Sequence, residues 1–162
     1  MNKQNYIQGF KVFNQDFTTR SGIKFAVGDH KHIDGEVVAG PINGHGWQFC
    51  KNFEDTFRFV RENPILCEII AFGEISKEYK DDYYEYDEIY ACSDIYIKRV
   101  ISREEIISMA KELCDWKLQR LIITYNMTDE EIEEIEQSLP PNSEKTKKYI
   151  DYYHRGNGKA FE

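Results

Sequence analysis

The sequence has no uninterrupted apolar run close to the ~20 residues that a membrane-spanning helix needs. Its four cysteines are far apart, with neither a Cys-x-x-Cys pair nor the nearby histidines that a zinc site needs. A Gly-rich phosphate loop ending in Lys-Ser or Lys-Thr is missing, and so is a Gly-x-Ser-x-Gly elbow. These absences argue against a membrane span, a cysteine-based zinc module, P-loop nucleotide hydrolysis and serine-esterase chemistry.

Basic side chains are outnumbered, with 21 Lys and Arg against 29 Asp and Glu, and the formal net charge is −8. Binding to nucleic acid or to an anionic membrane requires clustered Lys and Arg, so we expect neither as a partner. The polar first residues lack the basic-then-apolar pattern of a secretion signal, and we therefore expect a cytoplasmic protein.

Strand patterns fill the first two thirds of the chain and helix patterns fill the rest. This order predicts an α+β fold of short, mostly antiparallel strands with one packed helix, followed by a helical C-terminal extension. We expect a core domain over residues 6–101 and an extension over residues 102–162 that docks on it. Apolar runs and turn residues predict strands at Phe10–Phe13, Lys24–Val27, Trp47–Cys50, Leu66–Gly73 and Asp94–Ile101. The Asp34-Gly35 pair predicts a hairpin turn between two extended pieces within residues 33–38.

Helix starts have clear local signals. Asn52 is a good N-cap for a helix that runs to about Arg61. Ser102 and Thr128 each precede a Glu by three residues, which is the capping-box pattern at the start of an α-helix. The apolar run at 121–125 fits either a strand or the end of the helix before it, and we favour the strand.

Several short motifs occur in an order that resembles a known group of domains. Together they look like a small uncharacterised domain family that is common in bacterial phages and prophages, and the resemblance covers residues 9–105. Where this chain has Trp47-Gln48-Phe49-Cys50, members of that family often have Phe-His-Phe-Cys. The motifs are Gly9–Asn14, Asp16–Thr18, Val27-Gly28, Asp34-Gly35, Trp47–Asn52, Ala71–Ile75 and Arg99–Ile101.

The order of turn, aromatic strand, capped helix and Phe-Gly-Glu-Ile strand also resembles small bacterial ADP-ribosyltransferases. That resemblance implies NAD as a cofactor, held between two short sheets. It makes Lys11, His45 and Trp47 the candidate catalytic residues, although Lys11 stands where the family has His. The catalytic pattern is therefore incomplete, and without this alternative we expect no cofactor.

The sequence contains four histidines, of which three attract attention. His45 lies in a Gly-His-Gly loop, where it is either a surface side chain or a ligand contact. His30 and His32 share one face if their segment is a strand, with Asp34 close by. No fourth ligand is visible, so we expect no metal site.

An acidic, tyrosine-rich stretch follows the Leu66–Gly73 segment. Tyrosine gives large contact area at low entropic cost and is enriched at protein interfaces. The stretch is either a solvated excursion whose tyrosines pack on the sheet or a surface that recognises a basic protein. The candidate partner-binding residues are Tyr79, Asp81, Asp82, Tyr83, Tyr84, Glu85 and Tyr86.

No set of residues identifies a reaction, so our leading hypothesis is a non-enzymatic protein. We expect an accessory protein of a phage or prophage, directed at the host or at a defence system, that binds another protein through the tyrosine-rich stretch. The alternative is a divergent or degenerate ADP-ribosyltransferase-like domain that binds NAD. A third hypothesis is a structural component of the virion.

Overall fold

The computed structural model describes residues 5–40, 44–59, 62–78, 88–113, 115–140, 147–148 and 150. The chain divides into two compact units, Met1–Ile101 and Ser102–Glu162. The first contains an antiparallel sheet and the second contains three helices within its described residues. The fold is therefore α+β, as the order of strand and helix patterns predicts.

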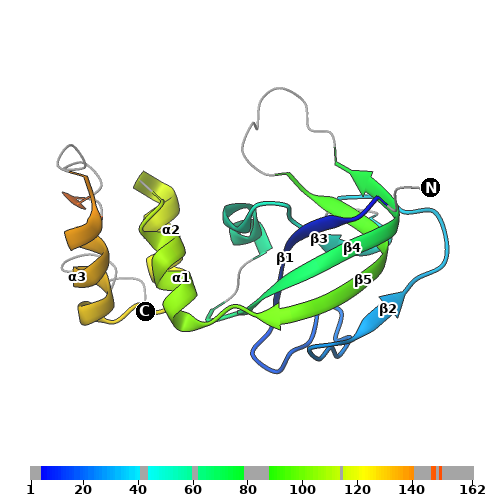
Figure 1. Cartoon of the computed structure of the whole chain (residues 1–162), viewed down its shortest axis with the longest axis horizontal. Coiled ribbons are helices and arrows are strands. Elements are labelled where there is room, and N and C mark those ends of the chain that lie inside the picture. Colours follow the sequence, from blue (N-terminus) through cyan, green and yellow to red (C-terminus); the bar gives the residue numbers. More distant parts are fainter. Residues whose placement is uncertain are drawn as a thin grey trace. The chain divides into compact units, whose positions relative to one another are not determined.

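Two long strands form the centre of the sheet (Figure 1). These are β4 (Ile65–Lys77) and β5 (Tyr90–Val100), which pair as an antiparallel hairpin. Strand β1 (Ile7–Phe13) pairs with the edge of β4 that faces away from β5. Strands β2 (His30–His32) and β3 (Trp47–Phe49) pair with different halves of β5. The strand expected at 24–27 is only an isolated bridge between Thr18 and Lys24.

One face of the sheet carries the core. Because side chains alternate between the two faces of a strand, β4 and β5 each bury every second residue over part of their length. Large aromatic rings fill the space in front of this face, and several of them are in edge or tilted contact. The core cluster consists of Phe13, Phe25, Trp47, Phe49, Cys67, Ile69, Ala71, Cys92, Ile95 and Ile97.

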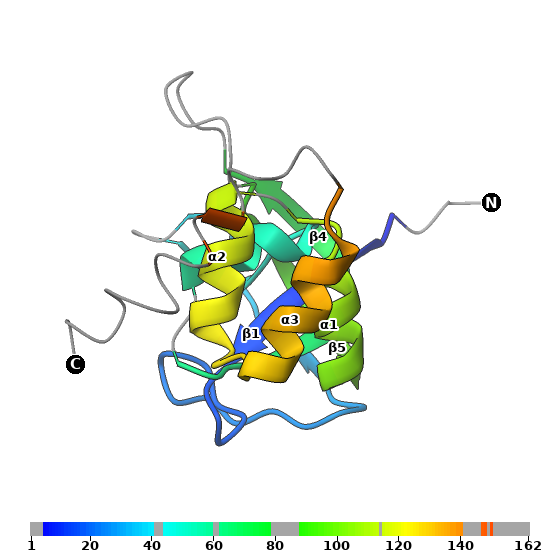
Figure 2. The same cartoon turned by 90° about the vertical axis from the view of Figure 1, so that its left-hand side faces the viewer.

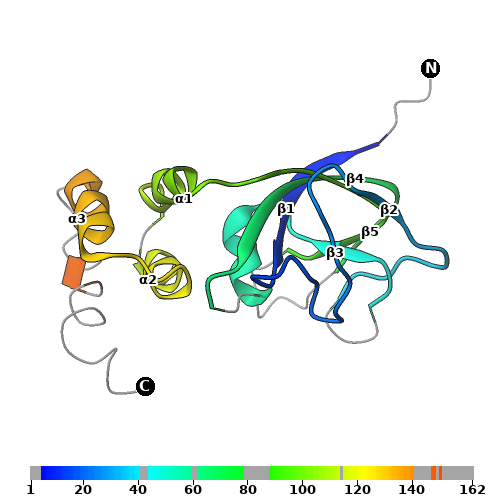
Figure 3. The ribbon, with the colours of Figure 1, turned by 90° about the horizontal axis from the view of Figure 1, so that it is seen from below.

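The sheet curves until β1 meets the chain just after β3 (Figure 3). Phe10 N donates to Cys50 O at 2.7 Å, and Cys50 N donates to Phe10 O at 2.9 Å. Gly9 lies beside this bridge, and a Cβ atom there would be 2.5 Å from Cys50 O. The residue before the bridge must therefore lack a side chain for the two backbones to come this close.

A β-bulge interrupts the pairing of β4 with β5 between Phe72 and Ile75. Gly73 provides it with a backbone at φ 76°, a conformation that favours glycine. The shift brings Glu74 N within 2.9 Å of Ser93 Oγ, which in turn donates to Asp94 Oδ2 at 2.7 Å. A Cβ atom on Gly73 would collide with the same two side chains.

The helix expected after Asn52 is a 3-10 helix, η1 (Phe53–Phe59), and not an α-helix. Asp55 N donates to Asn52 O at 3.3 Å, which is the tighter i to i+3 spacing of a 3-10 turn. Phe53 and Phe57 are both buried. The helical prediction was right in position, and the helix type differs because a short segment is held by its buried aromatic rings.

Three α-helices form the described part of the second unit (Figure 2). They are α1 (Arg103–Ala110), α2 (Asp115–Thr124) and α3 (Asp129–Ser138). Both predicted capping boxes are present, at Ser102 with Glu105 and at Thr128 with Glu131. These starts were predictable because a capping box depends only on residues within one turn.

The strand favoured for 121–125 is wrong, because residues 121–124 belong to α2. Leu118, Leu121 and Ile122 are buried together on that helix, at the spacing of one helical face. Arg103 connects α1 to α3 through two hydrogen bonds to Glu131, at 2.9 and 2.8 Å. A short apolar run therefore continued a helix that the residues before it had already started.

We expect Gly73→Ala to destabilise the first unit more than Gly22→Ala. Both glycines have positive φ, which costs an L-residue about 1 kcal/mol or more. Only Gly73 also meets Ser93 and Asp94, and such overpacking adds about 1–3 kcal/mol. Urea unfolding followed by Trp47 fluorescence, in a Trp116→Phe background, measures both free energies of unfolding. Equal losses would show that the bulge tolerates a side chain.

Candidate functional site

The three catalytic candidates from the sequence line one groove of the first unit. Lys11 comes from β1, Trp47 from β3, and His45 from the loop before β3. The groove has a volume of 830 Å³, within the usual range of small-molecule sites. Residues far apart in the sequence are thus brought together by the pairing of β1 with the end of β3.

Lys11 points to the core side of β1, where a charged side chain is unusual. It is half-buried, and its Nζ donates to Gln48 O at 2.5 Å and lies 5.7 Å from the centre of the Phe13 ring. Burial lowers the pKa of Lys11 to about 8, although the nearby Cys92 and Cys50 oppose this shift. A sizeable fraction of this amine is therefore neutral just above physiological pH.

Trp47 forms a wall of the groove and is also part of the core. Its ring stands at 90° to the ring of Phe25, with the centroids 5.4 Å apart. Its Nε1 is buried and has no hydrogen-bond acceptor among the described residues. The rings of Phe13 and Phe49 are buried beside it and line the same groove, so part of the space expected for a ligand is filled by aromatic side chains.

His45 is held at the groove by its own backbone and ring. Its N and O pair with Val38 in an isolated bridge, at 2.9 and 2.8 Å. Its Nε2 contacts Asp34 O at 2.6 Å, and its ring lies against Gly35, whose φ is 102°. The histidine is therefore a fixed part of the rim and not a freely moving loop side chain.

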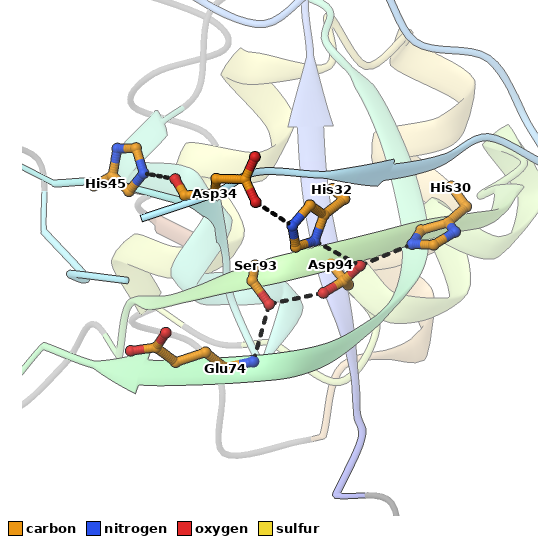
Figure 4. A network of polar contacts seen from close by, with 7 residues as sticks. All are labelled: His30, His32, Asp34, His45, Glu74, Ser93 and Asp94. Atoms are coloured by element: carbon orange, nitrogen blue, oxygen red, sulfur yellow. Dashed lines mark hydrogen bonds and ion pairs between the residues drawn. The ribbon is translucent and has the colours of Figure 1, made fainter. Parts of the chain in front are cut away.

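A second polar feature connects β2 with β5 (Figure 4). His30 Nε2 and His32 Nδ1 each lie 3.0 Å from the same oxygen of Asp94. The other ring nitrogen of His32 is 3.0 Å from Asp34 Oδ1, so both of its nitrogens face a carboxylate. Ser93 completes the cluster with its hydrogen bond to Asp94.

In this cluster, the protonated form of His32 and the ionised form of Asp94 stabilise each other. Hydrogen bonds to Asp34 and Asp94 raise the pKa of His32, because both favour the protonated ring. Burial acts to raise the pKa of Asp94, but the hydrogen bonds from His30, Ser93 and His32 outweigh it and the pKa is lowered. The cluster is therefore most strongly bound where His32 is protonated and Asp94 is ionised.

The sequence prediction placed His30 and His32 on one face of a strand with Asp34 nearby, and the structure agrees with that arrangement. It could not identify Asp94, which lies 62 residues from His32. Within the part of the chain that the structure describes, no group of three or more His, Cys, Asp and Glu side chains is placed to hold a metal ion.

The partner-binding candidates of the tyrosine-rich stretch lie outside the described residues. Their flanks are described, and they close the β4–β5 hairpin firmly. Glu78 N donates to Ile89 O at 2.9 Å. Lys77 forms an ion pair with Glu88 at 2.8 Å, and the Tyr90 hydroxyl donates to the same carboxylate at 3.2 Å. The candidates Tyr79, Asp81, Asp82, Tyr83, Tyr84, Glu85 and Tyr86 thus belong to the connection of this hairpin.

No helix in the described ranges combines the length and the apolar character that crossing a bilayer would require.

The fold and the groove define a small α+β domain built on a curved antiparallel sheet.

Residues 7–109 match the family model of a domain of unknown function, DUF7666, and the chain belongs to that family. The match runs from β1 into α1 and so includes the whole groove. No curated protein matches this chain. No solved structure matches it either.

We expect the pKa of His32 to fall in Asp34→Asn and in Asp94→Asn, because each change removes a carboxylate that stabilises the protonated ring. The titration of the ring protons by NMR measures this directly. Glu36→Gln is the matched control, because Glu36 is an exposed acid of the same segment. An unchanged His32 pKa in both variants would mean that the cluster does not form in solution.

Proposed function

We propose that the chain binds another protein through the tyrosine-rich connection of the β4–β5 hairpin. The observation that carries this proposal is the closed base of the hairpin, where Glu78 pairs with Ile89 and Lys77 pairs with Glu88. A base fixed in this way attaches the connection to the centre of the sheet, which reduces the entropy lost on binding. The chemistry of the connection selects a partner with a basic surface.

The acidic and phenolic side chains of the connection suit such a partner for two reasons. Through its ring, tyrosine can stack on an arginine guanidinium or attract a lysine ammonium, and its hydroxyl can donate a hydrogen bond. Clustered carboxylates steer a basic surface toward the complex and make association sensitive to salt. Because the sequence resembles phage and prophage domains, we propose that the target is a host protein or a defence protein and that binding takes place in the cytoplasm.

We expect a variant with Tyr83, Tyr84 and Tyr86 changed to Ser to lose its partner. The intact chain should capture a basic protein from a bacterial lysate, and the purified pair should bind at least about tenfold more weakly in the variant, because aromatic side chains dominate binding energy. Their association should also weaken as salt rises.

A variant with Tyr6 and Tyr96 changed to Ser is the matched control, because both are exposed tyrosines outside the connection. It should retain full affinity. Equal affinity of the triple variant and the unmodified chain would overturn the proposal.

A second candidate function is NAD binding in the groove, as the resemblance to ADP-ribosyltransferases implies. The observation that favours it is the position of Lys11, His45 and Trp47, which all line the same groove. The volume of 830 Å³ suits a ligand of appreciable size.

If the groove binds NAD, calorimetric titration of the unmodified chain with NAD should give a heat of binding. The Trp47→Ala variant should bind NAD more weakly than the unmodified chain. The substitution removes the largest flat wall of the groove, and truncation of such an aromatic contact costs about 1 kcal/mol or more. Phe53→Leu is the control, because Phe53 is buried but does not line the groove. Absence of heat at millimolar NAD, with no transfer of labelled ADP-ribose to a lysate, would exclude this candidate.

A further inference from the structure

The lining of the groove differs in charge from the rest of the chain. The chain as a whole carries −8, yet none of the described residues that line the groove is Asp or Glu. Lys11 and Arg20 both line it, together with His45. An acidic protein therefore has a groove whose fixed charges are positive.

Lys11 is a cation that no carboxylate neutralises within the described ranges of the chain. Its ammonium donates a hydrogen bond to the neutral carbonyl oxygen of Gln48, and it forms no ion pair with an acid among the described residues. The ionisable groups that face it are the thiols of Cys50 and Cys92, and burial raises the pKa of Cys92 to about 12. A partly desolvated cation without a counter-ion is costly, and an anion placed beside it recovers that free energy.

The rest of the lining combines aromatic rings with neutral polar side chains. Phe13, Phe49 and Trp47 are aromatic lining residues, and Asn14 and Gln48 are among the polar ones. The aromatic part of this surface is favourable for a flat hydrocarbon body. Arg20 is exposed and lies in the turn after Thr19, where it can attract an anion at the entrance without being desolvated.

We propose that this groove binds a small molecule that carries one oxyanion group, such as a carboxylate, on a flat apolar body, with Lys11 as its counter-ion. The site does not depend on the tyrosine-rich connection. It also differs from the NAD candidate in its ligand, because a single desolvated amine matches a monoanion better than it matches a pyrophosphate with several donors to satisfy.

Binding of this kind is linked to protonation. An anion beside Lys11 favours the ammonium, so the complex raises the lysine pKa and binding weakens as pH rises past about 8. The groups that face Lys11 are Cys50 and Cys92, with Cys67 opposite it on β4, and the pKa values of Cys67 and Cys92 are both raised to about 12 by burial. Arg20 and His45 line the groove further out.

Calorimetric titration of the full chain with benzoate tests the proposal, with benzamide as the neutral isostere. Benzoate should bind at least about tenfold more tightly than benzamide, since a charge-assisted hydrogen bond contributes on that scale. Lys11→Met should lower benzoate affinity about tenfold or more, and Arg20→Gln should lower it by a smaller factor. Lys31→Met should leave it unchanged, because Lys31 contacts the Phe25 ring outside the groove.

A measurement on the unmodified chain does not depend on how the variants fold. The side-chain carbon shifts of Lys11, followed by NMR against pH, should report a pKa well below that of the other lysines, and benzoate should raise it. Lys11→Met should also raise the thermal midpoint of unfolding, because the change removes a desolvated cation and retains most of its volume.

The outcomes separate the possible ligands. Equal binding of benzoate and benzamide, or benzoate affinity that survives Lys11→Met, overturns the proposal. Tight binding of inorganic phosphate without benzoate overturns it in favour of a phosphate site. Heat from NAD but not from benzoate overturns it in favour of the dinucleotide candidate, and absence of heat from all four compounds overturns both.

Discussion

The antiparallel bridge between Phe10 and Cys50 is the contact on which the first unit depends. It joins β1 to the chain after β3, so the curved sheet closes around its own apolar face. The bridge occupies part of the β1 edge that β4 leaves unpaired, and an unpaired edge invites pairing with other chains. The side chain of Lys11 lies on the interior side because Gly9, Lys11 and Phe13 share the inner face of β1.

The two faces of the sheet therefore carry different chemistry. The inner face holds the aromatic core and a groove with positive charge. The outer face holds the cluster of His30, His32 and Asp94, and Asp94 alternates with the buried Ile95 along β5. The Gly73 bulge positions Ser93 against Asp94, so this outer cluster depends on backbone geometry in β4. Asp34 connects the two sites, because its carboxylate contacts His32 and its carbonyl oxygen contacts the ring of His45.

Local sequence signals predicted the parts of the fold that depend on neighbouring residues. The capping boxes at Ser102 and Thr128 needed only the next turn, and the apolar run near Ile69 identified the central strand. The contact of Asp94 with His32 could not be predicted, because it is made by strand pairing between segments far apart in the chain. The surroundings of Lys11 were hidden for the same reason, since β1 meets Cys50 only after closure.

Glu78 and Ile89 close the hairpin, so the register of β4 and β5 does not depend on the amino acids that connect the two strands. Described residues outside that connection form the strand pairing, the core cluster and the lining of the groove. Substitutions and changes of length there cost little, because loop-closure entropy grows slowly with length. A connection attached in this way can therefore accept new sequence while the sheet and the groove stay the same.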